Sequence, residues 1–553
     1  MARLTRWGTL VAVLAVCVCA ALGAKSLAGV AWNSVVDYKS QYTALGVPAA
    51  AHGSAEASRT VLVIIDGLRV DASRKMGTLN SLRSYGSDLV LKTPQPSLSY
   101  PNWTTLLSGA PPAVSGVVTN WHEGKAGAET IFDTAKEAGV QSVFVGPEDF
   151  EALYGIKAKT SNSFMRKWDE AYLTETYVDE AIKRAALQPT LLVIHLPDVD
   201  EAGHAFGGAS KQYADTVARV DTDLNRLVHE LSDGHTVFVI TADHGHIDTG
   251  GHGGWEPVVT SVPCVVSGPG VMIGKGTANQ VDVASSVAML AGIGAPRMTT
   301  GTPLEAVITS GSAEALRDAQ SARDEFDLAA AQKIAAAIGQ PVSATAGPGE
   351  RRSAALDTML AFERSARLPF AVLGAMFCVV AVLAIGFASW RALAAAAAGG
   401  AAYYAVFLGL YLGVHGYKFS LSAFNSEDKI SAWMNGRLVE AAIATVVAVL
   451  VASIVYPMLR RSPKPARGDY LAGWLTLGPA TALVILATLG LQVAWFWWGW
   501  GVQPVWDLPN LAWGFKFDID LLQATAVGLV AVVTPLVSFV VGRYHPKVRT
   551  PAR

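Results

Sequence analysis

Six apolar runs divide the 553-residue chain into a part suited to lipid and a part suited to water. Each run approaches the roughly 20 residues that a helix needs to cross a bilayer. One precedes the polar part and five follow it, at 7–24, 368–390, 392–414, 438–459, 471–498 and 521–541. With 51% hydrophobic and only 16% charged residues, the sequence predicts a polar domain held between an amino-terminal span and a five-helix transmembrane domain.

Four parts are therefore expected: a membrane anchor at 1–24, an extracytoplasmic domain at 25–310, a helical linker at 311–366 and the transmembrane domain at 367–553. Cleavage of the first run as a signal peptide, near Ala21-Leu22-Gly23, is the alternative to an anchor. Basic residues near span ends favour the cytoplasm. In a six-span arrangement they all fall on one side: Arg3, Arg6, Arg391, Arg460, Arg461, Lys464, Arg467, Arg543, Lys547, Arg549 and Arg553. The polar domain is thus predicted to face the periplasm, the extracellular space or a lumen, with the carboxy terminus cytoplasmic.

Charge and cysteine usage exclude two classes of protein. A net charge of -2 offers no broad basic surface for nucleic acid, so phosphate recognition needs a local site. Cys17, Cys19 and Cys378 lie in apolar runs and leave Cys264 alone in the polar part, which argues against a disulfide framework. The tryptophan-rich stretch at 495–506 reads as an aromatic belt at the membrane interface, with a platform for a lipid headgroup as the alternative.

Short β-branched runs alternate with amphipathic stretches between residues 60 and 310. The runs TVLVIID, QSVFVG, TLLVIHL and TVFVITAD are each separated by such a stretch, which predicts an α/β fold with a mostly parallel sheet flanked by helices. Three runs end in acidic or histidine residues: Asp66, then Asp198 and Asp200, then Asp243 and His244. Because ligands bind at the carboxyl ends of parallel strands, one pocket is expected to collect them.

Aspartate and histidine at strand ends are ligand types for Zn²⁺ or Mn²⁺. Two such ions about 4 Å apart clamp a phosphate and activate a hydroxyl nucleophile. The segment PQPSLSYPNWTTLLSG supplies four hydroxyl candidates, and residue types alone do not choose among Ser97, Ser99, Thr104 and Thr105.

Four motifs, IDGLR, SYPNWTTLLSG, DEAGH and ADHG, together resemble the alkaline phosphatase superfamily over residues 60 to 310, in particular its type I phosphodiesterase/nucleotide pyrophosphatase branch. The resemblance implies an alkaline phosphatase-like fold, Ser99 as the nucleophile and Asn120 as the group that stabilises the oxyanion. It also implies two divalent metal ions, Zn²⁺ or alternatively Mn²⁺. One ion would be held by Asp200, His204 and His252, and the other by Asp66, Asp243 and His244. Asp198 is the alternative to Asp200.

The element DHGHIDTGGHGG resembles that of glycosylphosphatidylinositol ethanolamine phosphate transferases, which share an amino-terminal anchor, an outward catalytic domain and carboxy-terminal spans. This chain has fewer spans, and it has His246 where those enzymes have methionine. We interpret His246 as a surface histidine, with support of a metal ligand as the alternative. Asp248 is expected to orient a ligand histidine or to cap the glycine turn.

The resemblance implies a membrane-bound, metal-dependent enzyme that cleaves a phosphodiester through a phosphoserine intermediate. We expect transfer of a phosphoethanolamine-type headgroup from a phospholipid to a glycan or lipid acceptor. Hydrolysis by water is the alternative. A sulfatase is disfavoured because its C/S-x-P-x-R pattern requires arginine where Trp103 stands, and the complete ligand set disfavours a non-catalytic scaffold. The sequence sets neither headgroup, acceptor nor oligomeric state.

Overall fold

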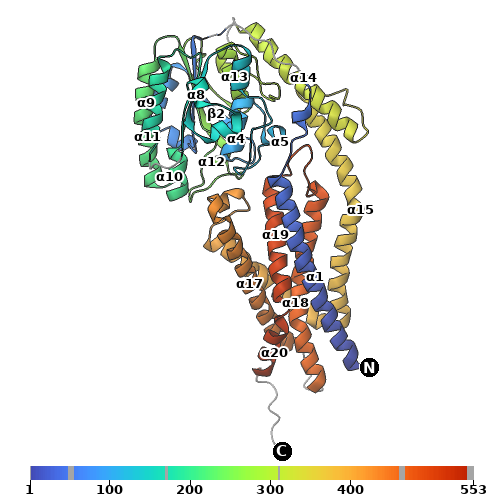
Figure 1. Cartoon of the computed structure of the whole chain (residues 1–553). Helices are drawn as coiled ribbons and strands as arrows, with labels where there is room; N and C mark the ends of the chain where they lie inside the picture. The colour runs from blue at the N-terminus through green and yellow to red at the C-terminus, as the bar shows by residue number, and fades with distance from the viewer. Residues whose placement is uncertain are drawn as a thin grey trace, which may run out of the picture.

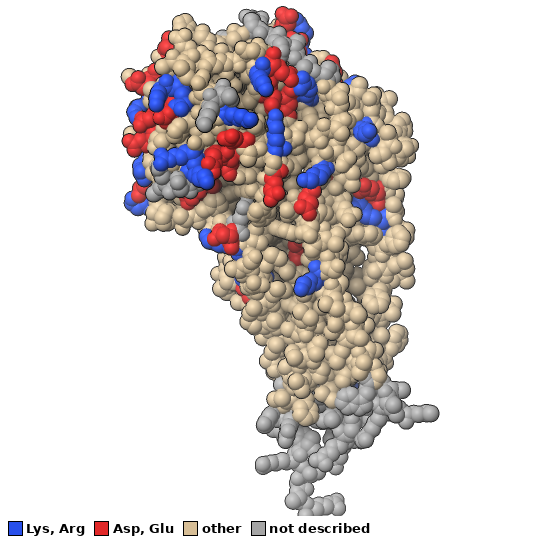
Figure 2. Space-filling model, viewed as in Figure 1, with Lys and Arg blue, Asp and Glu red and all other residues tan. Residues whose placement is uncertain are grey.

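The computed structural model describes residues 2–47, 55, 57–167, 172–308, 312–459 and 467–544. An α/β domain lies at one end of a bundle of long helices, and the amino-terminal end of the chain lies at the opposite end of that bundle (Figure 1). On the face drawn in Figure 2, charged side chains gather over the α/β domain, whereas the helical part is almost uniformly uncharged. This division matches the polar and apolar parts of the sequence.

An eight-stranded sheet in the order β4-β3-β5-β1-β6-β7-β2-β8 forms the centre of the α/β domain. Its strands are β1 Arg59–Ile65, β2 Ser87–Lys92, β3 Ser142–Pro147, β4 Phe164–Arg166, β5 Leu191–Leu196, β6 Thr236–Thr241, β7 Ser261–Ser267 and β8 Gly274–Asn279. All neighbours pair in parallel except β7, which is antiparallel to β6 and β2. The predicted mostly parallel sheet is confirmed. Strands β5 and β6 are buried along their whole length, as expected for a sheet covered on both faces.

Helices flank this sheet on both sides, with α9 and α11 on one side and α4 and α13 on the other (Figure 1). The helices of the domain are α2 Val70–Ser73, α3 Gly77–Tyr85, α4 Ser99–Ser108, α5 Pro112–Ser115, α6 Ile131–Glu137, α7 Asp149–Tyr154, α8 Ala158–Ser161, α9 Thr174–Ala185, α10 Asp198–Phe206, α11 Lys211–Leu231, α12 Pro257–Thr260 and α13 Asp282–Ala291. Helix α11 shows why they dock. Its buried residues Val217, Val220 and Leu224 recur every three or four positions and form one apolar stripe.

The second part of the chain is helical, and most of its helices are long and apolar. Its helices are α1 Ala2–Val36, α14 Ala313–Ala337, α15 Arg351–Ala388, α16 Trp390–Leu408, α17 Ile430–Met458, α18 Arg467–Trp500, α19 Leu511–Val530 and α20 Thr534–Tyr544. Among the described residues, five stretches are long and apolar enough to cross a membrane: Gly8–Val36, Arg351–Ala388, Trp390–Val414, Ile430–Met458 and Leu475–Trp500. They coincide with the first five predicted spans.

The sixth predicted span, at 521–541, is not one straight helix. Helices α19 and α20 meet at a break with a bend of 58°. Pro535 lies in the first turn of α20. Proline has no N–H to donate to the carbonyl of Ala531, and its ring would clash with that carbonyl in a continuous helix. The chain therefore bends before Pro535.

Three predicted boundaries differ from those of the helices. Helix α1 continues to Val36, past the expected limit at 24, and packs along α19 so closely that a Cβ on Gly528 would lie 2.4 Å from the carbonyl oxygen of Cys17. Helix α15 runs unbroken through the linker boundary at 366, and α17 begins at Ile430 instead of residue 438. The basic residues Arg460, Arg461, Lys464, Lys547, Arg549 and Arg553 lie outside the described residues.

The tryptophans of the 495–506 stretch pack within the helical part. Trp495 contacts Trp500 and Trp513 at centroid distances of 5.3 and 5.0 Å, and Trp506 is buried 5.2 Å from Tyr42. None of the tryptophans of this stretch lines the cavity of the candidate site described below. The headgroup platform therefore stays without structural support.

Candidate metal centre

Three adjacent parallel strands deliver the predicted acidic residues to one edge of the sheet. Ile65 at the end of β1 pairs with Leu196 of β5, and Ile64 pairs with Thr241 of β6. Asp66 follows β1, Asp200 lies in the first turn of α10, and Asp243 follows β6. These three carboxylates meet because their strands share a register.

Glycine allows the close approach between the first two of these segments. Gly67 has φ +70°, and a Cβ there would lie 2.8 Å from the Cα of Asp200. A side chain at residue 67 would therefore clash with the backbone that carries a candidate ligand, which explains the glycine of the IDGLR motif.

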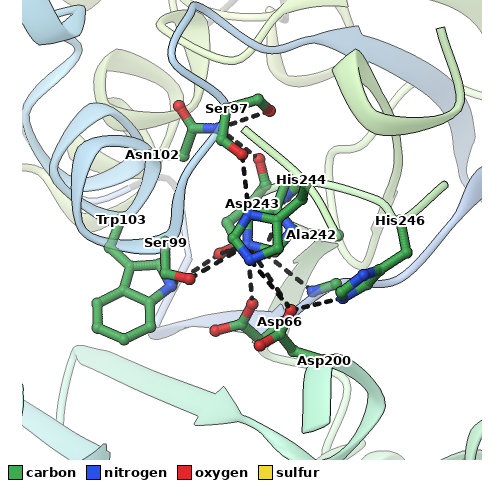
Figure 3. Close-up of polar contacts among 12 residues, drawn as sticks. Asp66, Ser97, Ser99, Asn102, Trp103, Asp200, Ala242, Asp243, His244 and His246 are labelled. Atoms are coloured by element: carbon green, nitrogen blue, oxygen red, sulfur yellow. Dashed lines mark hydrogen bonds and ion pairs between the residues drawn. The ribbon is translucent and has the colours of Figure 1, made fainter. Parts of the chain in front are cut away.

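The six predicted metal ligands converge in two groups. One is Asp200, His204 and His252, and the other is Asp66, Asp243 and His244; within each group the ligand atoms all lie within 4.8 Å of one another. Figure 3 shows Asp66, Asp200, Asp243 and Ser99 arranged around His244. Asp66, Asp243 and His244 are fully buried, and His204 is the most exposed, with 23% of its side chain accessible.

Hydrogen bonds fix the ring orientation of the two histidines in the first group. The Nδ1 of His252 donates to the carbonyl oxygen of Ser97 at 3.1 Å. The Nδ1 of His204 faces the Oδ1 of Asn425 at 3.3 Å, and that amide is oriented because its Nδ2 donates to the carbonyl oxygen of His204. With both Nδ1 atoms acting as donors, each neutral ring carries a lone pair on Nε2.

Those two Nε2 atoms lie only 3.1 Å apart, and the Nε2 of His204 is 3.3 Å from the Oδ2 of Asp200. Two lone pairs that face each other beside a carboxylate require a cation between them, either a proton or a metal ion. Burial opposes charge on His204, but the neighbouring Asp200 carboxylate outweighs burial and raises the pKa of His204 to about 9. The group therefore attracts a cation.

The second group concentrates negative charge at a buried site. The Nε2 of His244 lies 3.3 Å from the Oδ1 of Asp66 and 3.3 Å from the Oδ2 of Asp243. Burial raises the pKa of Asp66 well above its usual value, and the charges of Asp243 and Asp200 raise it further. Among the described residues, the Oδ1 of Asp66 is buried without a hydrogen-bond donor.

An unpaired carboxylate oxygen in a buried site is unfavourable unless a cation compensates it. Carboxylate oxygens and imidazole nitrogens in groups of three are a ligand set for Zn²⁺ and for Mn²⁺. The residues present thus fit a divalent metal ion in each group. This fit rests on donor chemistry and burial and does not distinguish the two metals.

Outer contacts hold the carboxylates of the second group in place. His195 on β5 donates from Nε2 to the Oδ2 of Asp66 at 2.9 Å. Burial lowers the pKa of His195 to about 3, so its ring is neutral. Trp103 Nε1 donates to the Oδ2 of Asp243 at 2.9 Å, and the backbone N–H of Gly67 donates to its Oδ1. Such outer contacts orient ligands and tune their basicity.

Sequence reasoning missed both of these supporting side chains. His195 had a visible signal, because it is a polar residue inside the otherwise apolar strand LLVIHL. Trp103 lies within the SYPNW motif but had been considered only for the position where a sulfatase has arginine.

Ser99 is the hydroxyl that the structure brings to the centre. It begins α4, and its Oγ lies 3.2 Å from the Nε2 of His244. The other candidates have structural partners: Ser97 Oγ accepts from the Nδ2 of Asn102, Thr104 bonds the carbonyl oxygen of Tyr100, and Thr105 bonds that of Pro101.

The helix start adds electrostatic stabilisation at Ser99. The amino-terminal end of α4 carries partial positive charge, which favours an anion beside Ser99. Asn120 lines the same cavity, and its Oδ1 accepts from the backbone N–H of Tyr100 at 3.0 Å. The donor end of that amide, its NH₂ group, is thereby turned away from Tyr100.

His246 is not a surface residue, contrary to our interpretation of the sequence. It is fully buried, and its Nδ1 accepts from the backbone N–H of Gly251 at 3.1 Å. The ring proton is therefore on Nε2, which donates to the Oδ1 of Asp200 at 2.6 Å. His246 also has Asp200 and His244 within ligand distance, but a protonated Nε2 makes it a support for Asp200 and not a ligand.

Asp248 and Asp198 have structural partners of their own. Asp248 accepts from Arg69 Nη1 at 2.6 Å, which ties its carboxylate to the arginine that follows the IDGL strand end. Asp198 accepts from the backbone N–H groups of Leu173 and Thr174 at the start of α9. Of the two alternatives, Asp200 is the one that reaches the centre.

The membrane part of the chain reaches the centre through the segment between α16 and α17. Asn425 of this segment contacts His204 as described above. Glu256 of the α/β domain accepts from the hydroxyls of Ser420 and Ser422, each at 2.9 Å, and Gly254 N–H donates to Ser422 Oγ. The α/β domain and the segment between α16 and α17, which are far apart in sequence, thus form one site. No local sequence pattern around residue 425 indicates this contact.

The centre opens into a cavity of about 510 Å³ between the α/β domain and the helices. Its wall includes Ser99, Asn120 and ligands of the first group on one side, and Trp32 of α1, Phe424 and Leu511 of α19 on the other. A substrate with a polar and an apolar end would meet matching surfaces here.

A mostly parallel α/β sheet that presents a hydroxyl beside two Asp/His groups at its strand ends defines an alkaline phosphatase-like domain. Residues 60–258 match the family described as Type I phosphodiesterase / nucleotide pyrophosphatase. The α/β domain is thus similar to this family, and the resemblance predicted from the motifs is confirmed.

Known relatives and solved structures match part of the chain. GPI ethanolamine phosphate transferase 1 of Mus musculus is 25% identical over 304 residues, which cover 44% of this chain and 32% of the relative. The Homo sapiens protein of that name is 26% identical over 252 residues, covering 39% and 27%. The matches thus span about a third of these relatives or less. The structure of human ectonucleotide pyrophosphatase / phosphodiesterase 5 aligns with 47% of this chain and 99% of its own, at 16% identity and a TM-score of 0.38.

Proposed function

We propose that this protein is a membrane-bound, metal-dependent enzyme that transfers a phosphoethanolamine-type headgroup from a phospholipid to a glycan or lipid acceptor. The observation that carries the proposal is the position of Ser99. Its Oγ lies 3.2 Å from a candidate metal ligand, at a helix start, in a cavity shared by the α/β domain and the membrane helices. The names of the curated relatives supply the headgroup.

Reaction through Ser99 would proceed in two displacements. The Oγ–P bond forms as the bond between phosphorus and the diacylglycerol oxygen breaks, and the proton lost by Ser99 balances the one gained by diacylglycerol. An acceptor hydroxyl then attacks the same phosphorus and releases Ser99. The NH₂ group of Asn120 and the start of α4 would stabilise the negative charge that develops on the phosphoryl oxygens.

Two divalent ions, Zn²⁺ in our proposal, would be held by Asp200, His204 and His252 and by Asp66, Asp243 and His244. When bound, such ions supply Lewis-acid stabilisation of a phosphate and lower the pKa of a hydroxyl. The protein's own contribution is orientation: His195, Trp103 and His246 fix the carboxylates, and Asn425 fixes His204.

The α/β domain faces away from the cytoplasm in this proposal. Helices α15 and α16 join at the end of the bundle opposite the α/β domain, close to Arg391 and to the amino-terminal end of α1 (Figure 1). Basic residues at that end favour its placement in the cytoplasm. A cysteine-accessibility experiment on intact cells tests it: a single cysteine at exposed Lys211 should react with a membrane-impermeant reagent, and one at Arg391 should not.

A transfer assay with a phospholipid labelled in its ethanolamine tests the function. Label should reach a glycan or lipid acceptor in membranes that contain the wild-type chain, and Ser99→Ala should reduce transfer by roughly 10³-fold or more. Release of the label only as water-soluble ethanolamine phosphate would favour hydrolysis, the function that the family description itself names. No turnover by a protein that holds both metals would contradict both functions.

Metal content separates loss of catalysis from loss of structure. The Ser99→Ala protein should retain the metal content of the wild type by elemental analysis, because the serine is not required for either ligand group. His252→Ala should lose one ion. If Ser99→Ala lost metal to the same extent as His252→Ala, its inactivity would not support a nucleophilic role.

A further inference from the structure

A second cavity, of about 730 Å³, lies among the membrane helices directly beside the candidate site. Its walls come from α1, α17, α19 and Phe424 of the segment between α16 and α17, and sixteen of its twenty lining residues are apolar or glycine. The exceptions are Lys25, Ser431, Asp518 and Thr525. We call this second cavity the membrane groove.

The membrane groove and the catalytic cavity share part of their walls. Trp32 of α1, Phe424 and Ile430 line both. The rings of Trp32 and Phe424 lie edge to face with their centroids 6.4 Å apart. The two cavities therefore adjoin at these three side chains, with no backbone segment among the residues that they share.

One face of α19 lines the two spaces in succession. Leu511 lines the catalytic cavity, and Phe515, Leu522 and Leu529 line the groove, at intervals of four to seven residues that lie on one side of a helix. On α17 the lining runs from Ile430 to Ala442, a rise of about 18 Å. That depth is similar to one leaflet of a hydrocarbon core of about 30 Å.

We infer that the membrane groove binds an acyl chain of the donor phospholipid while its phosphate lies at Ser99. This inference rests on the proposed function and adds the site that selects a diacyl substrate. Of the possible occupants, an acyl chain fits because it is apolar, comes from the surrounding leaflet and is covalently continuous with a headgroup that the catalytic cavity must receive. Burial of its methylene groups would supply binding energy remote from the reacting phosphorus.

Two glycines of α1 provide a matched pair of variants. A Cβ on Gly29, which lines the groove, would meet no atom within 4 Å, and the same is true of Gly23, which does not line it. Both glycines are exposed and helical, so leucine is sterically tolerated at each position and changes helix propensity equally. Gly29→Leu should place a side chain in the groove, whereas Gly23→Leu should leave the groove open.

The substrates are also a matched pair: dioleoyl phosphatidylethanolamine and its deacylated form, glycerophosphoethanolamine, which share the same phosphodiester. Gly29→Leu should lower kcat/KM for the diacyl substrate by about tenfold, because the leucine displaces methylene groups from the groove. Its kcat/KM for the deacylated substrate should stay within about twofold of the wild-type value, and Gly23→Leu should change neither. Equal losses on both substrates, or no loss on either, would overturn the inference.

Lipid binding is measured independently of turnover. Full-length protein incubated with dioleoyl phosphatidylethanolamine in detergent is analysed by native mass spectrometry. Wild type and Gly23→Leu should retain bound lipid, and Gly29→Leu should lose most of it. Ala442→Phe, which narrows the groove from α17, should repeat the result. If the wild type binds lipid and both groove variants lose it, but no headgroup is transferred, the proposed function is wrong while the lipid site in the groove is supported. If Gly29→Leu and Ala442→Phe both retain lipid, the inference that the groove binds an acyl chain is wrong.

Discussion

Asn425 offers the most direct test of the idea that the membrane part completes the metal centre. It is the one residue of the segment between α16 and α17 that hydrogen-bonds a candidate ligand among the described residues. Its backbone has φ 65°, a region where alanine would be strained. Glycine is therefore the substitution of choice, because Asn425→Gly removes the amide without forcing a new backbone conformation.

The expected effect follows from what the amide does. Asn425 Oδ1 accepts from His204 Nδ1 at 3.3 Å, which keeps the lone pair of Nε2 pointing at the candidate metal position. Loss of one such outer contact typically lowers metal affinity by 10- to 100-fold. Because the bond is at the long end of the hydrogen-bond range, we expect about tenfold, or about 1.4 kcal/mol. The loss should be confined to the ion of the first group.

Metal occupancy is measured by elemental analysis after dialysis against buffers of graded free Zn²⁺. Asn425→Asp restores the acceptor for His204 Nδ1 but replaces the Nδ2 donor by an oxygen that faces the carbonyl oxygen of His204, so it should recover only part of the affinity. Asn162→Gly is the control, since Asn162 has φ 55° but is exposed at the carboxy-terminal end of α8. Equal loss of both ions, or unchanged occupancy in Asn425→Gly, would refute the reasoning.

Three further outcomes are expected. Trp103→Phe removes the 2.9 Å hydrogen bond to Asp243 and should lower the affinity for the ion of the second group about tenfold. In the same dialysis assay, the affinity for the ion of the first group should not change. Gly203→Ala should lower the free energy of unfolding by about 1–3 kcal/mol, because the new Cβ would lie 2.4 Å from the His246 ring. Denaturant titration measures this change, and wild-type stability would show that the ring moves aside at no cost. Chelation should abolish turnover and lower the melting temperature, and Zn²⁺ or Mn²⁺ should restore both; a melting temperature indifferent to chelator would contradict a metal bound to the folded state.

The sequence determined the two-part plan and the residues that carry the chemistry. Apolar runs of about 20 residues admit few structures besides membrane helices, and β-branched runs alternating with amphipathic stretches admit few besides a helix-flanked parallel sheet. Asp66, Asp243 and His244 were identifiable because a strand end is a local feature of sequence. Ser99 and Asn120 came from a family motif, and physical reasoning alone had left Ser97, Thr104 and Thr105 open.

Only the tertiary structure decided which side chains support those residues and which cavities lie beside them. The sequence alone predicts a surface position for His246 because nothing in DHGHID shows that Gly203, on helix α10, leaves room for its ring. Asn425 and the membrane groove depend on how α1, α17 and α19 pack beneath the α/β domain, where residues separated by hundreds of positions meet. The periodicity of apolar residues predicts which face of a helix or strand is buried, but not which other element packs against that face. The hydrogen bond that supports His204 and the position of the membrane groove both depend on which elements pack together.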